Sequence, residues 1–265
     1  MRVLCCLLLA LVAATSCGDV ARTPPPGLEV LFVGNSLIYV GNTPAVFDAL
    51  ARANGTAVAS DMIVKGGATL AQRANDGSVA RALASKRYSA VVLQERGGDL
   101  MCSLGPGSCA DSRAAIKALV ALAHDAGAKA YLLGTYQGDP AASKALVLAE
   151  SAAAAEAGIP YLEISEKLQR LQTTAPAMTW LAPDGMHPGP ALSLLNAAVV
   201  YQALLERLPE PAALEVTAPI YGTTSGLTER LRRAEDPPPL ATTPGQLDYP
   251  EESVRTVLQS LGESR

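Results

Sequence analysis

The chain has 265 residues, of which 49% are hydrophobic and 17% are charged. This length and composition indicate one globular domain with an appended segment, and they exclude a chain that is disordered throughout. The formal net charge of -4, from 21 basic and 25 acidic residues without a long basic run, argues against nucleic acid as a partner.

The amino terminus has the pattern of an export signal. Arg2 is basic, and residues 3–14 form an apolar stretch that is too short to span a bilayer. The following Ala-Thr-Ser-Cys17 sequence resembles a bacterial lipobox, in which a signal peptidase cleaves before the cysteine and the thiol carries a lipid. We therefore expect a signal peptide at 1–16, a lipid on Cys17, a Pro-rich tether at 17–27, and an exported protein anchored in a bacterial cell envelope. Ordinary signal cleavage beside an unmodified cysteine is the alternative.

The cysteine pattern is consistent with export. Cys5 and Cys6 lie inside the expected signal, so the mature chain keeps Cys17, Cys102 and Cys109. Cys102 and Cys109 flank a loop rich in Gly and Pro that can bring the two thiols together, and an oxidising compartment favours a bond between them. We expect this disulfide, which leaves Cys17 as the odd thiol for the lipid.

Strand-like and helix-like segments alternate along most of the remaining chain. Short apolar and β-branched runs predict strands at 28–33, 57–64, 90–93, 130–133 and 161–164. Capping residues and periodic apolar positions predict helices from residue 43 onward and at 112–126, 141–157 and 190–208. This alternation predicts an α/β fold with three layers and a doubly wound, flavodoxin-like sheet of about five parallel strands.

Residues 209–265 follow a different, Pro-rich pattern. Weak helical signals appear at 227–233 and 251–261. We expect a carboxy-terminal extension packed on a domain at 28–208, and the sequence of this extension predicts no function.

Ser36 is the candidate nucleophile. It lies in Gly34-Asn35-Ser36-Leu37, directly after the first predicted strand, and ligands of doubly wound sheets bind at the carboxyl ends of the strands. Alone, this tetrapeptide is also compatible with an ordinary turn in which Asn and Ser bond their own backbone. A catalytic role requires a base nearby.

His187 is the candidate base. It follows Asp184 by three residues in a loop rich in Gly and Pro, so the carboxylate can accept the ring Nδ1 proton and leave Nε2 for the serine proton. An Asx turn that caps the next helix is the alternative interpretation of Asp184. His124 lies late in a predicted helix, where a solvated side chain is expected. Because the chain has 2 histidines and no paired-cysteine spacing, the sequence predicts no metal site.

Four segments together resemble the blocks of the SGNH (GDSL-like) hydrolase superfamily in the same order. The segments are residues 34–37, Gly66-Gly67 after the second strand, Gln94 after the third strand, and Asp184 with His187 before the last helix. The sequence departs from the family pattern twice, since Asn35 replaces the Asp of Gly-Asp-Ser and Gln94 stands where the family has Asn. The resemblance extends from residue 28 to about residue 208.

The resemblance implies a serine esterase that needs no cofactor. It implies an acyl-enzyme mechanism with Ser36 as nucleophile, His187 as proton shuttle and Asp184 as the carboxylate that orients it. It also implies an oxyanion hole formed by the backbone amides of Ser36 and Gly67 and the side-chain amide of Gln94. The alternative is that Gln94 bonds backbone groups where its strand ends, while Glu95 or Arg96 reaches the pocket and binds a polar substrate.

The substrate that the resemblance implies is a small-molecule or glycan ester. An envelope location favours O-acetyl or other short acyl groups on glycans, and an aromatic content of 4% argues against a long sugar-stacking cleft. Weaker candidates for substrate contacts are Glu95, Arg96 and Tyr136. An acyltransferase with the same triad and a glycan-binding scaffold without catalysis are the alternatives, and the sequence predicts neither the acyl acceptor nor the oligomeric state.

Overall fold

The computed structural model describes residues 27–239 and 245–262. The strands are β1 (Leu28–Gly34), β2 (Val58–Val64), β3 (Ala90–Leu93), β4 (Lys129–Leu133), β5 (Tyr161–Leu162), β6 (Leu214–Ile220), β7 (Arg232–Arg233) and β8 (Gly245–Tyr249). The helices are α1 (Ser36–Tyr39), α2 (Thr43–Ala53), α3 (Leu70–Asn75), α4 (Ser78–Ser85), α5 (Pro106–Asp125), α6 (Pro140–Ala157), α7 (Ser165–Thr174), α8 (Pro190–Leu205) and α9 (Glu251–Gly262). No helix in these ranges is long and apolar enough to cross a membrane. The expected signal peptide, Cys17 and nearly all of the expected tether lie outside the described residues.

Five parallel strands form the main sheet, which confirms the fold class predicted from the sequence. The strand order is β5-β4-β3-β1-β2-β7, and β7 pairs antiparallel with β2 at one edge. The chain passes from β1 to β2 in one direction and later to β3 and β4 in the other. The carboxyl ends of β1 and β3 therefore flank the point where the strand order reverses, and this is where doubly wound sheets bind ligands.

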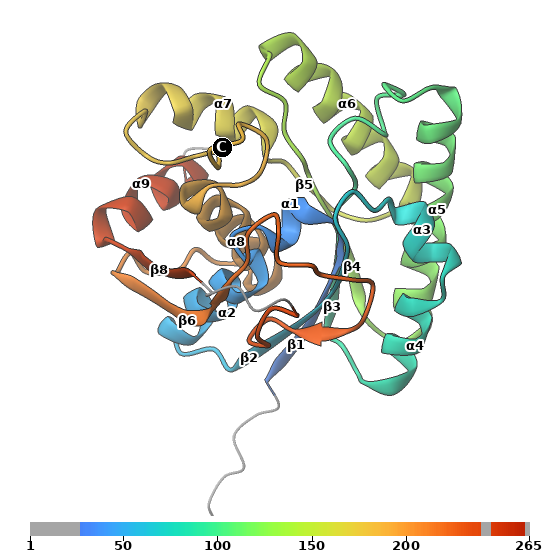
Figure 1. Cartoon of the computed structure of the whole chain (residues 1–265), viewed down its shortest axis with the longest axis horizontal. Helices are drawn as coiled ribbons and strands as arrows, with labels where there is room; N and C mark the ends of the chain where they lie inside the picture. Colours follow the sequence, from blue (N-terminus) through green and yellow to red (C-terminus); the bar gives the residue numbers. More distant parts are fainter. Residues whose placement is uncertain (1–26, 240–244, 263–265) are drawn as a thin grey trace, which may run out of the picture.

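Helices cover both faces of this sheet and give the molecule three layers (Figure 1). α2 and α8 lie on one face, whereas α3, α4, α5 and α6 lie on the other. β1 shows why the central strands are almost continuously apolar. Val30 and Phe32 enter the core with α2 and α8, and Leu31 and Val33 enter the opposite core, so all four side chains are fully buried.

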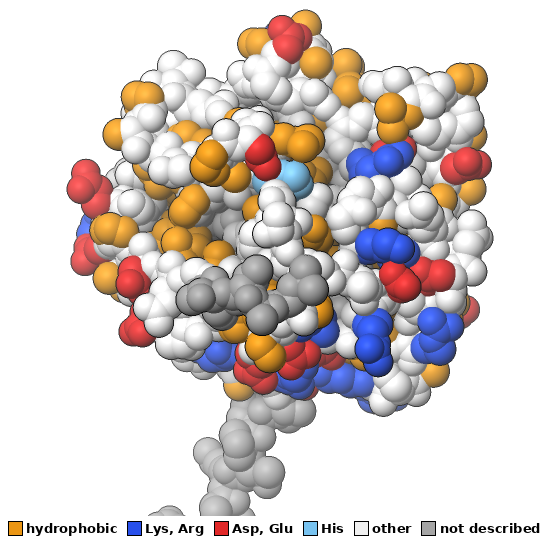
Figure 2. All heavy atoms as spheres, viewed as in Figure 1, with side chains coloured by type: hydrophobic (Ala, Val, Ile, Leu, Met, Phe, Trp, Pro, Cys, Tyr) orange, Lys and Arg blue, Asp and Glu red, His pale blue; other side chains and the backbone are white. Residues whose placement is uncertain are grey.

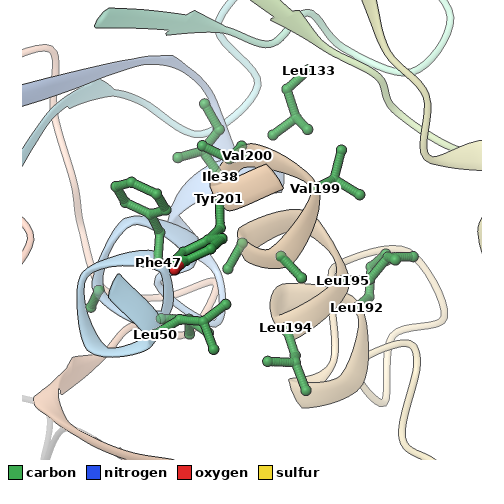
Figure 3. Packing of buried hydrophobic residues seen from close by; sticks show 14 of the residues in the cluster. Ile38, Phe47, Leu50, Leu133, Leu192, Leu194, Leu195, Val199, Val200 and Tyr201 are labelled. Atoms are coloured by element: carbon green, nitrogen blue, oxygen red, sulfur yellow. The ribbon is translucent and has the colours of Figure 1, made fainter. Parts of the chain in front are cut away.

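The core on the first face is built around α2 and α8 (Figure 3). Phe47 and Leu50 of α2 lie beside Val200 and Tyr201 of α8. α8 is apolar around most of its circumference because several elements cover it, as expected for a buried helix. Ile38 of α1 joins the same core and thereby anchors the turn that follows β1.

The segment after residue 208 contains the strands β6, β7 and β8 and the helix α9 (Figure 1). β7 extends the main sheet, β6 and β8 form an antiparallel ribbon, and α9 packs against α8. α9 confirms the helix expected at 251–261. The helix expected at 227–233 does not form, because Arg232 and Arg233 are extended as β7 and pair with β2.

The expected disulfide between Cys102 and Cys109 is confirmed. Their Cα atoms are 4.8 Å apart, and the bond joins the loop after β3 to the first turn of α5. The disulfide therefore restrains a segment that begins at the carboxyl end of a central strand.

Candidate active site

Ser36 is the first residue of α1, immediately after β1. Asn35 caps this helix, because its side-chain oxygen accepts a hydrogen bond of 3.0 Å from the Leu37 amide. A residue larger than Gly34 would clash, since a Cβ there would lie 2.7 Å from the Gln94 carbonyl oxygen. The turn thus holds Ser36 half-buried at the carboxyl end of β1, with a backbone amide that the first helical turn leaves without an intrahelical partner.

Asp184 and His187 form a hydrogen-bonded pair. The Nδ1 atom of His187 lies 2.7 Å from one carboxylate oxygen of Asp184. The other oxygen accepts hydrogen bonds from the backbone amides of Met186 and His187, each at 2.9 Å. The backbone bond from His187 has the largest effect in lowering the pKa of Asp184 to about 2. The carboxylate is therefore charged at neutral pH and engages Nδ1, which makes Nε2 the nitrogen available to a serine hydroxyl.

The loop that carries this pair is fixed at its base and at its tip. An isolated antiparallel bridge closes the base, and the Ala182 amide donates to the His187 carbonyl at 2.9 Å. The Tyr136 hydroxyl donates to the Met186 carbonyl at 2.6 Å, which ties the tip to the segment after β4. Tyr136, which the sequence suggests as a substrate contact, thus also positions the loop of the base.

Gly67 lies in the turn between β2 and α3. Its φ is 68°, in the left-handed region that favours glycine, and the residue is exposed. The Ala68 amide donates to the Lys65 carbonyl at 3.1 Å across this turn. Thr69 and Gln72 then form a reciprocal capping box that starts α3. Gly67 is consequently presented to solvent on a turn that is fixed on both sides.

Glu95 does not reach the cleft, contrary to the expectation from the sequence. It is 1% exposed, and its carboxylate accepts hydrogen bonds from the Leu70 amide at 3.2 Å and the Ser112 hydroxyl at 2.8 Å. Burial raises the pKa of Glu95, and these bonds oppose that shift. Leu70 is the first residue of α3, so Glu95 fixes the amino-terminal end of the helix that follows the Gly67 turn.

Arg96 is partly exposed and contacts the same turn. Its guanidinium makes a two-point ion pair with buried Asp99, with both N–O distances at 2.7 Å. Its Nη1 also approaches the Gly67 carbonyl oxygen at 3.4 Å. Arg96 therefore links the loop after β3 to the Gly67 turn, while part of its side chain remains accessible as a candidate substrate contact.

Gln94 is fully buried and does not present its amide to solvent. Its Nε2 donates a hydrogen bond of 3.0 Å to the Gly134 carbonyl, which joins the carboxyl ends of β3 and β4. The structure therefore does not bring the Gln94 amide to the oxyanion position that the resemblance implies. The backbone amides of Ser36 and Gly67 are left as the candidate oxyanion donors.

A cleft with a volume of about 350 Å³ opens beside these residues. Leu37, which follows Ser36, and Met186, which precedes His187, both line it. The immediate neighbours of the nucleophile and base candidates, from segments about 150 positions apart in the sequence, thus line one cleft at the sheet's carboxyl edge. Figure 2 shows hydrophobic side chains gathered around a histidine and an acidic side chain on the face in view.

His124 lies apart from this cleft. It is in the last turn of α5 and lines a different surface hollow, together with residues at the amino-terminal end of β4. Among the described residues, no group of three or more His, Cys, Asp and Glu side chains could hold a metal ion.

Comparisons with known proteins find similarity at the level of structure. No family model and no curated protein matches the chain. A candidate SGNH hydrolase from Slackia heliotrinireducens is 26% identical, with a TM-score of 0.54, over 67% of this chain and 98% of that protein. A DUF4886 family protein from Bacteroides uniformis is 17% identical, with a TM-score of 0.55, over 69% of this chain and 84% of that protein. An acetylxylan esterase from Geobacillus stearothermophilus is 15% identical, with a TM-score of 0.51, over 68% of this chain and 93% of that protein.

The structural match to the Slackia protein agrees with the resemblance that the order of the four sequence segments indicates. The chain belongs to the SGNH/GDSL-like hydrolase superfamily. In this SGNH-type chain Ser36 is the first residue of α1, directly after β1, and Gly67 lies in the turn directly after β2. Asp184 and His187 lie in the loop before α8, which the Tyr136 hydroxyl ties to the segment after β4.

The SGNH cleft also contains residues that sequence reasoning missed. Leu37 and Met186 line it and are neighbours of the triad in sequence, so their positions offered a signal. Leu168 and Gln172 come from α7, a helix that the sequence did not predict, and nothing in the sequence connected them with the site.

Proposed function

We propose that the protein is a serine hydrolase that cleaves carboxylic esters through an acyl-enzyme. The observation that carries this proposal is the Asp184–His187 hydrogen bond beside a cleft that is lined by Met186, the residue before His187, and by Leu37, the residue after Ser36. Ester hydrolysis in general fits the superfamily, since the solved structures of the same fold include esterases. A cofactor is not required, because serine, imidazole and carboxylate supply nucleophile, base and orientation.

The reaction proceeds in two halves. Ser36 Oγ attacks the ester carbonyl and its proton moves to Nε2 of His187, while the oxyanion is bound by the amides of Ser36 and Gly67. The tetrahedral intermediate collapses, and the alcohol leaves with the proton from His187. Water then repeats the sequence on the acyl-enzyme and releases the acid. Asp184 remains ionised throughout, because its pKa is about 2.

A fluorophosphonate probe tests the proposal, because it labels a serine that is activated by a base. We expect labelling of the wild-type chain at Ser36 and none in Ser36→Ala, which should also lose ester hydrolysis. Asp184→Asn should lower kcat by about a hundredfold or more, since the imidazole loses its orienting partner.

His124→Ala is the matched control, because this histidine lies outside the cleft. It should retain wild-type labelling and hydrolysis. Equal labelling of the wild type and Ser36→Ala would contradict the triad, and a wild type that binds glycan esters without labelling would identify a non-catalytic scaffold. Transfer of the acyl group to added glycan in preference to water would identify an acyltransferase.

We further propose that the protein is exported and anchored by a lipid on Cys17. The Cys102–Cys109 disulfide supports an oxidising compartment. Substrates in the cell envelope, including esters of glycans, are then the accessible ones. The fold shared with an acetylxylan esterase is compatible with a glycan ester, and the identity of the glycan stays a prediction from the sequence.

A further inference from the structure

The cleft beside the triad is larger than the ester group itself, so it can hold a further part of the substrate. Leu37 and Met186 border the reacting groups, and the cleft continues from them to Leu168 on α7. Its volume of about 350 Å³ lies within the range of small-molecule sites. We infer that it binds an apolar, uncharged hydrocarbon chain of the ester substrate, an inference that rests on the proposed esterase function.

Apolar side chains form the larger part of the cleft walls. Leu37, Leu168, Leu181 and Met186 contribute aliphatic or thioether side chains, and Tyr136 contributes its ring. None of the described residues that line it is charged, so a charged substituent would be buried without a partner. Met186 is 60% exposed, and a bound chain would cover this apolar side chain.

Most polar side chains at the cleft are already bonded within the protein. The Tyr136 hydroxyl donates to the Met186 carbonyl at 2.6 Å, and the Gln137 side-chain amide donates to the Gly97 carbonyl. Gln172 is the remaining polar side chain in the lining. A sugar ring in the cleft would therefore leave most of its hydroxyl groups unpaired, which disfavours it relative to a hydrocarbon chain.

The volume indicates the length of the chain. A methylene group takes up about as much space as a water molecule in the liquid, roughly 30 Å³, so a cleft of about 350 Å³ holds about twelve carbons. This chain is longer than the short acyl groups expected from the sequence. It can belong to the acyl or to the alcohol part of the ester, because both are attached beside the reacting carbonyl.

Two substrate series test the inference on the full chain. One series is p-nitrophenyl esters from acetate to hexadecanoate, and the other is acetates of alcohols of the same lengths. In one series kcat/KM should rise by about two- to fourfold for each added methylene and level off near twelve carbons. A rise in the first series assigns the cleft to the acyl chain, and a rise in the second assigns it to the alcohol. Flat or falling profiles in both series overturn the inference.

Gly138→Trp locates the chain. No atom lies within 4 Å of the position of a Cβ at Gly138, and its φ is outside the left-handed region, so the indole enters open space without backbone strain. In the acyl series we compare kcat/KM for the octanoate ester with that for the acetate ester, and in the alcohol series kcat/KM for octyl acetate with that for ethyl acetate. In the series that shows the rise, this ratio should fall by about tenfold or more. Gly222→Trp is the control, since Gly222 has the same open surroundings outside the cleft and should leave the ratio unchanged.

Met186→Ser is a second variant whose folding is not in question, because the side chain is exposed. It should lower the same ratio by about threefold, whereas Leu148→Ser, at a site 71% exposed on α6, should not change it. If Ser36 is labelled but kcat/KM does not depend on chain length, this inference is wrong while the proposed esterase function stands. Absence of both labelling and hydrolysis overturns the esterase and the inference with it.

Discussion

At the scale of single residues, Gln94 illustrates how a candidate catalytic group can be structural. Its side chain is 0% exposed, and its Nε2 donates to the Gly134 carbonyl at 3.0 Å. Gly134 is the residue after β4, so this bond ties the carboxyl ends of two neighbouring parallel strands together. The bond holds in place the segment after β4, which includes Tyr136.

Gln94→Ala should therefore reduce stability more directly than it reduces catalysis. The substitution leaves a buried carbonyl without its partner, and the free energy of unfolding should fall by about 1 to 3 kcal/mol. Urea denaturation measures this loss, and Gln172→Ala, at the rim of the cleft, is the control that should show little change. Fluorophosphonate labelling of folded Gln94→Ala should remain within about fivefold of the wild type. A fall in kcat of about a hundredfold at unchanged stability would restore the oxyanion role.

The sequence predicts the positions of the triad better than it predicts the surroundings of the triad. Ser36 and His187 are placed by turns with Gly, Asn, Asp and Pro, whose backbone preferences are local and visible in the sequence. Gln94 and Glu95 directly follow a buried strand, and the face toward which each side chain points depends on partners from β4, α3 and α5. Those partners are distant in sequence. The sequence alone could therefore not tell whether Gln94 and Glu95 are buried and hydrogen-bonded within the protein or exposed to the substrate.

At the scale of secondary structure elements, Glu150 connects α6 to the ends of β4 and β5. It is 2% exposed and accepts hydrogen bonds from the Thr135 amide at 3.0 Å, the Thr135 hydroxyl at 2.6 Å and the Tyr161 hydroxyl at 2.7 Å. Burial raises its pKa to about 7, against the effect of these bonds. The folded protein thus holds a proton on Glu150 that the unfolded chain releases near pH 4.5.

This raised pKa makes stability depend on pH in a defined direction. The contribution of Glu150 is fully present below pH 4.5 and is lost as the pH rises through about 7. The loss should be about 2 to 3 kcal/mol. Glu150→Gln does not titrate, so the difference in unfolding free energy between wild type and variant should shift by that amount between mildly acidic and mildly basic urea titrations. Glu156→Gln, exposed on the same helix, should follow the wild type, and parallel profiles for wild type and Glu150→Gln would contradict the assignment.

The sequence predicts the long, strongly patterned elements and misses the short ones. The five parallel strands and α5, α6 and α8 have continuous apolar runs or clear capping residues, and all of them form. Some of their bounds differ, since α5 begins at Pro106 and not at residue 112, and β5 ends at Leu162 and not at residue 164. α1, α3 and α4 have 4, 6 and 8 residues, too few for a periodic pattern to stand out. Of these short helices, α1 begins at Ser36 and α3 begins shortly after the Gly67 turn, so part of what the sequence does not predict lies at the site.

At the scale of the whole molecule, the carboxy-terminal segment is part of the main core. Val216, Tyr221, Val254, Val257 and Leu258 are buried in the same cluster as α2 and α8. The three solved structures compared with this chain match 67% to 69% of it, so a substantial part of the chain lies beyond the shared architecture. The sequence could not predict this packing, because Pro-rich connections separate short elements whose partners are on distant helices.

Leu258→Ala tests whether this segment and the catalytic domain unfold together. Leu258 of α9 is 5% exposed, and its truncation in a shared core should lower the free energy of unfolding by about 2 to 4 kcal/mol. Leu231→Ala, at a site 42% exposed in the same segment, should change it by less than about 0.5 kcal/mol. Because the core is continuous, urea should unfold both variants in one transition, seen equally by circular dichroism and by loss of fluorophosphonate labelling at Ser36. If Leu258→Ala instead produces an early transition that leaves labelling of Ser36 intact, α9 is a separate appendage and the shared core does not act as one cooperative unit.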